Sequence, residues 1–544
     1  MRQLAPLAGA LALLAVTAFS TPQELRRALE TITAPDLRAH LRFLSHDLLQ
    51  GRAPGTAGGR TAELYIAGEF ERAGLDGVGV AHLQPVPLLG LSLDTARLEL
   101  EFRARGRSVP FTYHDEVLLW PGVEDAQAAA DGEIVFVGYG VRAPEYRWDD
   151  FKDAQLQGKI LLFLVGDPPA PPDEPRRFDG RAMTYYGRWN YKVEEAERLG
   201  AAGALLIHTP WNAGYPWSVV QGSWSGEQLS LPRSAGQPAP LPLHGWLAQE
   251  FAARLLDAAG LDLAELHVQA ARRDFRPVPT GITLRARMPV LARRLESANV
   301  VGLLRGRDPE LAREVVVLTA HHDHLGIGPA VDGDSIYNGA YDNASGVALL
   351  LEIAQAFTTL ESRPRRSLLF IATAAEEAGL LGATHYVRNP LVPLTHTVAA
   401  INLDGANLWG ETDDVTALGA ERSTLARTVE ARARQLGMTL VPDRAPELGL
   451  FFRSDHFAFA RAGIPALLLD HGIEFRGRPD GWGAAVLDEW AARHYHRPSD
   501  EYRPDLQLAG AIQQARLAFL VAYDIAESPE RPAWLEPGQS PAVR

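Results

Sequence analysis

The chain has 544 residues, a formal net charge of -14 and an isoelectric point of about 5.6. This acidic balance argues against nucleic acid as the main partner, because binding to phosphates requires a basic face. Hydrophobic residues make up 46% of the chain, which allows a large buried core and roughly two to four domains. Cysteine is absent, so no disulfide braces the fold and any metal site must use His, Asp and Glu.

The first twenty residues have the features of a secretory signal peptide. Arg2 provides a positive start, residues 4–19 are apolar and uncharged, and Ala18-Phe19-Ser20 offers a small-x-small cleavage site. The apolar run is short for a membrane span, and no later stretch is long enough to cross a bilayer. We therefore expect an exported protein, periplasmic or extracellular, with no membrane attachment after signal cleavage.

The first half of the chain divides into a helical segment and a β-rich block. Residues 23–75 carry apolar side chains near helical spacing before the stop at Gly74. The sequence pattern changes from helical to strand-like near residue 131, and few clusters of candidate catalytic residues follow. We therefore predict an inserted β-rich domain at 128–280. Within it we expect strands at 133–139, 160–165 and 204–208, a helix at 191–199, and a proline-rich loop at 168–175.

From about residue 295 the predicted strands and helices alternate, which is typical of a mostly parallel sheet flanked by helices. We predict strands at 300–304, 315–320, 368–374, 398–403 and 466–469, and helices at 344–360 and 506–525. The fold class is therefore α/β, with a mostly parallel mixed sheet and an inserted β-rich domain. The predicted divisions are a signal peptide (1–20), the N-terminal part of the main domain (21–127), the insertion (128–280), the main part (281–530) and a tail (531–544).

Residue types that bind metals follow three of these predicted strands. His321 comes directly after one strand, Glu376 and Glu377 follow the next, and Asp404 follows a third, while Asp342 precedes a helix. Ligands of open α/β sheets gather beyond the carboxyl ends of the strands. Each residue alone would be read as a turn or cap residue, but their joint occurrence at one sheet edge is hard to explain by turn chemistry.

The spacing of these residues suits a metal centre. His321 and Asp323 lie two apart, so the Asp323 carboxylate can accept a hydrogen bond from the imidazole and fix its tautomer. Glu376 and Glu377 project differently, so one carboxylate can bind a metal while the other faces a water molecule. Asp342 can bridge two cations with its two oxygens. The alternatives are surface histidines, an acidic helix start and a helix cap.

With these residues in place, the chain resembles the di-zinc aminopeptidases of metallopeptidase family M28. The five motif segments of the catalytic domain occur in the family's order, and residues 45–56 resemble the family's opening segment. Residues 132–140, 158–160 and 200–204 resemble a protease-associated domain. The fold class expected from this resemblance is that of the zinc exopeptidases, with a protease-associated domain as the insertion.

The resemblance also implies a role for each site residue. His321 and Asp404 would bind one zinc ion, Glu377 and His496 the other, Asp342 would bridge the two, Glu376 would be the general base, and Asp323 the orienting carboxylate. A cis peptide is expected after the bridging residue, at Asp342-Asn343. The implied substrates are peptides with a free N-terminus, hydrolysed by a two-zinc-activated water. Phe451, Phe452 and Phe457 could line the pocket for the first side chain or belong to the core.

Three other readings of the same residues remain open. A carboxypeptidase or dipeptidase on the same scaffold would need a basic pocket, for which Arg453 is the nearest candidate. A non-catalytic binding protein would be expected to have lost ligands or the base, yet all six positions are filled by competent residues. A cyclising acyltransferase would bind a single metal ion. His324 has no assigned role.

Overall fold

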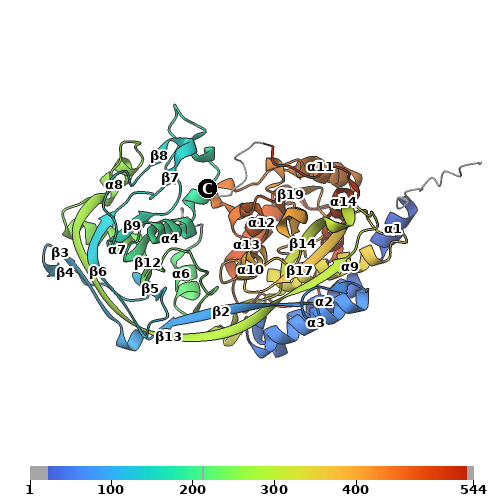
Figure 1. Cartoon of the computed structure of the whole chain (residues 1–544), viewed down its shortest axis with the longest axis horizontal. Coiled ribbons are helices and arrows are strands. Elements are labelled where there is room, and N and C mark those ends of the chain that lie inside the picture. The colour runs from blue at the N-terminus through green and yellow to red at the C-terminus, as the bar shows by residue number, and fades with distance from the viewer. Residues whose placement is uncertain (1–21, 211–213, 536–544) are drawn as a thin grey trace, which may run out of the picture.

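The computed structural model describes residues 22–210 and 214–535, so the predicted signal peptide lies outside the described residues. Two lobes lie side by side, and the long strands β2 (Leu83–Leu93) and β13 (Val278–Leu304) run from one to the other (Figure 1). We call the lobe that carries most of the C-terminal half the main lobe, and the other the second lobe. No described helix combines the length and apolarity that crossing a bilayer requires.

Strand β13 belongs to both lobes, and its sequence changes period accordingly. From 280 to 290 buried and more exposed residues alternate, and this half pairs with β3 (Glu99–Ala104) and β6 (Gln127–Phe136) of the second lobe. Its middle pairs with β2. Residues 297–304 are all buried, and the C-terminal end pairs with β17 (Ser367–Thr373) of the main lobe. The alternating half of β13 therefore has other elements packed against one face only. The continuously buried end has them packed against both faces.

The main lobe is an α/β unit with a mixed, mostly parallel sheet, as predicted. Four adjacent strands run parallel in the order β17, β14, β18, β21, with β13 antiparallel beside β17 and β19 antiparallel beside β21. Strand β20 extends the edge parallel to β19. The bounds are β14 Val315–His321, β18 Thr397–Asn402, β19 Asp414–Leu418, β20 Thr439–Val441 and β21 Ala466–His471.

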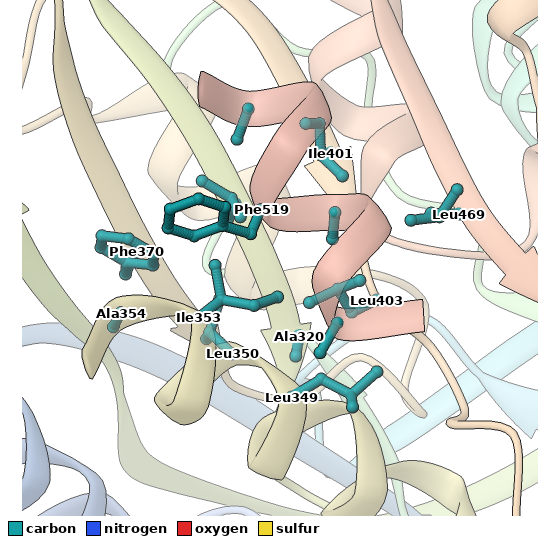
Figure 2. Close-up of a cluster of buried hydrophobic side chains, with 14 of the residues drawn as sticks. Ala320, Leu349, Leu350, Ile353, Ala354, Phe370, Ile401, Leu403, Leu469 and Phe519 are labelled. Carbon is teal, nitrogen blue, oxygen red and sulfur yellow. The ribbon is translucent and has the colours of Figure 1, made fainter. Parts of the chain in front are cut away.

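Helices cover both faces of this sheet. Alternate residues of β14 belong to two different hydrophobic clusters: Val316 and Leu318 pack with the helices of one face, Val315 and Val317 with those of the other. Phe519 of α14 stacks on Phe357 of α9 with ring centroids 4.1 Å apart. Figure 2 shows Phe519 facing Ile353 of α9. The helices of the first face are α2 (Ala34–Leu44), α3 (Ala57–Ala73), α9 (Gly346–Thr358), α11 (Leu425–Gln435) and α14 (Ala509–Glu527), and those of the second are α10 (Leu381–Arg388) and α12 (His456–Arg461).

The second lobe has its own mixed sheet, with helices as well as strands. Its strand order is β5, β12, β10, β9, β6, β13, β3, β4, and the four strands from β12 to β6 are parallel. Strands β3 and β5 pair into this sheet although they precede residue 128, and the domain boundaries remain a prediction. The bounds are β4 Arg107–Ser108, β5 Val117–Pro121, β9 Ile160–Leu164, β10 Gly203–His208, β12 Leu243–Ala248, α4 Trp189–Arg198, α6 Trp217–Trp224, α7 Gln249–Ala258 and α8 Leu263–Ala270.

The remaining elements are short or peripheral. The hairpin of β15 and β16 follows the histidine-rich segment after β14, and α13 precedes the loop that carries His496. Their bounds are α1 Pro22–Glu30, α13 Trp482–Arg493, β1 Asp76–Gly77, β7 Arg142–Ala143, β8 Trp148–Asp149, β11 Gln228–Ser230, β15 Gly326–Val331 and β16 Asp334–Tyr337.

Candidate metal centre

The carboxyl edge of the main sheet brings the predicted ligands together. His321 is the last residue of β14, Glu376 and Glu377 follow β17, and Asp404 follows β18. Asp342 lies in the π-type turn Ala340–Ser345 at the start of α9. His496 comes from the loop after α13 and joins them. We call these six residues the metal cluster.

Asp342 lies between the two histidines and faces each with a different oxygen. Its Oδ1 is 3.2 Å from Nε2 of His321, and its Oδ2 is 3.3 Å from Nε2 of His496. Asp404 Oδ1 is also 3.2 Å from His321 Nε2, and Glu377 Oε2 is 3.2 Å from His496 Nε2. The geometry therefore divides the ligands into the two pairs implied by the resemblance, with Asp342 common to both.

Glu376 lies beside the first pair. Its Oε2 is 4.0 Å from Nε2 of His321, and donor atoms of His321, Glu376 and Asp404 all lie within 4.8 Å of one another. A second such group consists of His321, Asp342 and Glu377. Asp404 and His496 are the more exposed members, with 22% and 20% of the side chain accessible, so the cluster opens to solvent on their side.

The charges of the metal cluster suit divalent cations. Burial raises the pKa of Glu376 well above its usual range, and Asp404 and Glu377 raise it further, against the opposing effect of His321. Burial alone would lower the pKa of His321, but Glu376 and Asp404 outweigh it and raise the pKa well above the ordinary value. Four carboxylates thus share two imidazoles in a buried space. Bound cations would offset this crowding, and the His, Asp and Glu donors are those that zinc accepts.

The loops that carry the carboxylates are fastened to each other. Asn343 accepts hydrogen bonds from the backbone N–H groups of Gly346 and Gly405, both at 2.9 Å, and donates to the carbonyl of Leu403. The peptide Asp342-Asn343 is cis, as expected. Asn343 therefore ties the Asp342 turn to the Asp404 loop, which fixes the two carboxylates relative to each other.

Asp323 is placed differently from the prediction. Its Oδ1 is 3.8 Å from Nδ1 of His321, too far for a hydrogen bond, and the nearer acceptor is its backbone carbonyl at 3.3 Å. The Asp323 carboxylate instead accepts the backbone N–H of Glu376 at 3.0 Å. Buried Asp323 thus orients His321 through its main chain and positions the Glu376 segment through its side chain.

His324 contacts the cluster, although no role was predicted for it. Its Nδ1 is 2.5 Å from Oε1 of Glu377, leaving Oε2 of that carboxylate toward His496. Gly339 makes room for the ring: it has φ +58, and a Cβ there would come within 2.5 Å of the imidazole of His324. The HxDH spacing was the only sequence signal for this contact.

Ser454 and Asp500 are two further supports that the sequence did not reveal. Ser454 donates to Oδ2 of Asp404 at 2.5 Å. The Asp500 carboxylate accepts the backbone N–H groups of Tyr341 and Asp342 at 2.9 and 3.0 Å. Asp500 follows His496 by four residues in the sequence, but only the fold shows which atoms Ser454 and Asp500 hold.

Arg52 holds the backbone segments that carry the cluster residues. Its buried guanidinium donates to the carbonyls of Leu44, His322, Asn338 and Gly339. It thereby links the segment at 45–56 to the strand and the turn that carry His321 and Asp342.

The three phenylalanines belong to the core. Phe451, Phe452 and Phe457 are 6%, 6% and 3% exposed and form part of the hydrophobic cluster on the second face of the main sheet. Phe452 and Phe457 also contact Tyr185 of the second lobe, with ring centroids 6.0 and 5.0 Å apart. They therefore help to join the two lobes.

The fold and the cluster define a class: an α/β protein with paired carboxylate and histidine ligands at the carboxyl edge of a mostly parallel sheet. Residues 299–520, which include the whole metal cluster, match the model of peptidase family M28.

Three known proteins resemble the chain in fold or in part of its sequence. An aminopeptidase from Aneurinibacillus sp. strain AM-1 has the same fold, with a TM-score of 0.53 at 18% identity, over 94% of this chain and 98% of that one. Aminopeptidase YwaD of Bacillus subtilis is 27% identical over 227 residues, which are 40% of this chain and 44% of that protein. A probable zinc metalloprotease of Pyricularia oryzae is 33% identical over 126 residues, 23% of this chain and 22% of that one. The matched part thus spans less than half the length of these two relatives.

Proposed function

We propose that the chain is an exported aminopeptidase that uses two zinc ions and Glu376 to hydrolyse the first peptide bond of its substrates. The observation that carries the proposal is the position of Asp342, whose two oxygens face His321 and His496 at 3.2 and 3.3 Å. A carboxylate between two such pairs is the arrangement that holds two cations close together. Part of the chain is similar to proteins named aminopeptidase and zinc metalloprotease, which supports the same activity and metal.

The cluster residues would divide the work as follows. His321 and Asp404 would hold one ion, Glu377 and His496 the other, and Asp342 both. When bound, such a pair of ions polarises the scissile carbonyl and makes water more acidic. Glu376 would take the proton from the attacking water and return it to the leaving amine. Asp323 would position Glu376 through the hydrogen bond that its carboxylate accepts from the backbone N–H of Glu376.

Metal analysis combined with a substrate panel tests the proposal. The zinc-loaded protein should contain two ions per chain and cleave aminoacyl amides with a free amine, but not N-blocked peptides. Glu376→Gln should lower kcat by about 10²- to 10⁴-fold, the usual contribution of a general base, while zinc content stays at two. Cleavage of N-blocked peptides would favour a carboxypeptidase, one ion per chain would favour the acyltransferase reading, and unchanged turnover in Glu376→Gln would remove the base from its role.

Export and the nature of the second lobe are parts of the same proposal. We infer secretion from residues 1–20 and expect N-terminal sequencing of the secreted protein to begin just after Ser20. The predicted insertion at residues 128–280, which forms most of the second lobe, would be a protease-associated domain that frames the substrate cleft. Recovery of the full chain in the cytoplasm with its N-terminus intact would contradict export.

A further inference from the structure

Two polar side chains lie inside the main sheet, just before the residues of the metal cluster. Thr319 of β14 and Asn402 of β18 are register partners on neighbouring parallel strands. Thr319 precedes His321 by two residues, and Asn402 precedes Asp404 by two. Both are buried, with 0% and 1% of their surface exposed. A buried polar group is costly unless it is hydrogen-bonded, so the partners of these two side chains show what they do.

Three hydrogen bonds lead from these side chains to the metal cluster. The Thr319 hydroxyl donates to Oδ1 of Asn402 at 2.6 Å. Nδ2 of Asn402 donates to the Ser454 hydroxyl at 2.5 Å, and this hydroxyl donates to Oδ2 of Asp404. We call Thr319, Asn402 and Ser454 the relay. It crosses from β14 to β18 and ends on a carboxylate of the cluster.

The carboxylate at the end of the relay fixes the direction of every hydrogen bond in it. An ionised Asp404 can only accept, so the single hydroxyl proton of Ser454 must point toward it. The Ser454 oxygen must then accept, and only the Nδ2 side of Asn402 can donate to it. Oδ1 of Asn402 therefore faces Thr319, whose hydroxyl proton completes the relay. A reversed Asn402 amide would place an acceptor beside Ser454 and draw the proton away from Asp404.

The segment that carries Ser454 has an anchor of its own. Thr373 of β17 donates to the carboxylate of Asp455, the residue that directly follows Ser454. This contact holds the Ser454 backbone against the sheet independently of the Asn402 amide. The direction of the Asn402 amide therefore decides where the hydroxyl proton of Ser454 points, and the position of the segment does not depend on it.

We propose that Thr319 and Asn402 are positioning residues for the ion that Asp404 would bind. Through the Ser454 hydroxyl they occupy Oδ2 of the Asp404 carboxylate and leave Oδ1 for that ion. Oδ1 is the oxygen that lies 3.2 Å from Nε2 of His321, the other residue assigned to the same ion. Hydrogen bonds of this kind orient a ligand and support metal affinity. The inference rests on the proposed two-zinc function.

Chelator competition on the two-zinc protein measures the effect without turnover. Ser454→Ala should weaken one of the two zinc-binding steps by about 10- to 100-fold, the usual effect of losing a supporting contact. Thr319→Val keeps the shape of the side chain but removes its proton, so it should weaken the same step by a smaller factor, and Thr319→Ser should restore it. Because both residues act through one proton, the double variant should bind zinc as Ser454→Ala does.

Asn402→Asp is a second variant, which decides the question alone if Thr319→Val does not fold. An ionised carboxylate at this position accepts from Thr319 but cannot donate to Ser454, so the same zinc-binding step should weaken. Thr397→Val is the matched control for Thr319→Val. Thr397 is a buried threonine of β18 whose hydroxyl has no hydrogen-bond partner among the described residues, so its loss should leave both steps unchanged.

The outcomes separate the relay from the proposed function. Unchanged zinc affinity in Thr319→Val and Asn402→Asp would overturn the relay and leave the two-zinc function standing. Losses that simply add in the double variant of Thr319 and Ser454 would do the same, because independent contacts add and members of one relay do not. A protein that binds no zinc would overturn both the proposed function and the relay.

Discussion

The two lobes use the same architecture, parallel strands flanked by helices, but they treat buried carboxylates in opposite ways. In the second lobe, Asp167 accepts hydrogen bonds from the backbone N–H and the hydroxyl of Thr184 at 2.6 and 2.7 Å. Asp150 accepts from the backbone of Val141 and the indole of Trp148 at 2.9 and 2.7 Å. Each carboxylate there has its own donors.

In the metal cluster of the main lobe the carboxylates converge on two shared histidines. Within the described part of the chain, the two oxygens of Asp342 meet only His321 and His496, and His321 is also the neighbour of Glu376 and Asp404. The comparison shows what distinguishes the metal cluster from a structural acid: several carboxylates converge on one space and share the same histidines.

The largest effect should come from removing the shared carboxylate. Asp342→Asn should lower zinc content below two ions per chain and reduce activity by more than the loss of Glu376, because both ion positions lose a ligand. Inductively coupled plasma analysis of the purified variant measures this. Asp167→Asn is the comparison in the second lobe and should leave the zinc content at two. Retention of both zinc ions by Asp342→Asn would mean that a residue other than Asp342 is the ligand shared by the two ions.

The core that carries the main sheet should be the next most sensitive part. Phe519 is fully buried and stacks on Phe357 between α14 and α9. Figure 2 shows Phe519 among the buried side chains of this core. Phe519→Ala should reduce the free energy of unfolding by about 3–5 kcal/mol, the typical cost of deleting a buried phenyl ring. Urea denaturation followed by circular dichroism gives the value. A loss below about 1 kcal/mol would mean that the packing around α14 is looser than described.

Loss of His324 should weaken metal binding without removing a ligand. His324→Ala frees Oε1 of Glu377, and loss of such a supporting contact lowers metal affinity by about 10- to 100-fold. Competition with a chromophoric chelator measures the affinity independently of turnover. His267→Ala, in α8 of the second lobe, is the control and should behave as the unaltered protein. Unchanged zinc affinity in His324→Ala would mean that the contact of His324 with Glu377 does not support metal binding.

The smallest effect concerns pH and the second lobe. Burial raises the pKa of Asp150 to about 7, against the opposing effect of its hydrogen bonds and of Lys192. Because the folded state holds this proton more tightly than the unfolded state, its stabilising contribution is complete below about pH 4 and is lost as the pH rises to about 7. The urea midpoint followed by tryptophan fluorescence should therefore decline over this range, and Asp150→Asn should reduce the slope. An identical slope in the variant would exclude Asp150 as its source.

The sequence predicted the main sheet and its ligands well for a physical reason. Strands covered on both faces are continuous apolar runs, so β14, β17, β18 and β21 were placed within a few residues, and the polar residues after them marked the edge. His496 required the family resemblance, because a histidine in a loop carries no periodic signal. The long extent of β13 was missed, because its change of period at the join resembles a domain boundary.

Side-chain contacts between distant segments could not be predicted in the same way. The contact of His324 with Glu377 and the hydrogen bond of Ser454 to Asp404 depend on how loops pack at the sheet edge. The pairing of Asp323 with the Glu376 backbone, instead of with His321, depends on a rotation of one side chain.

The shared strand also bears on how the chain folds. Leu93 of β2 pairs with Val290 of β13, so the whole second lobe is a loop whose two ends are held side by side. Closing so long a loop in an unstructured chain has an entropic cost that folding of the loop itself removes. Assembly of the second lobe would therefore deliver β13 to the edge of β17, which makes the insertion an aid to completing the main sheet.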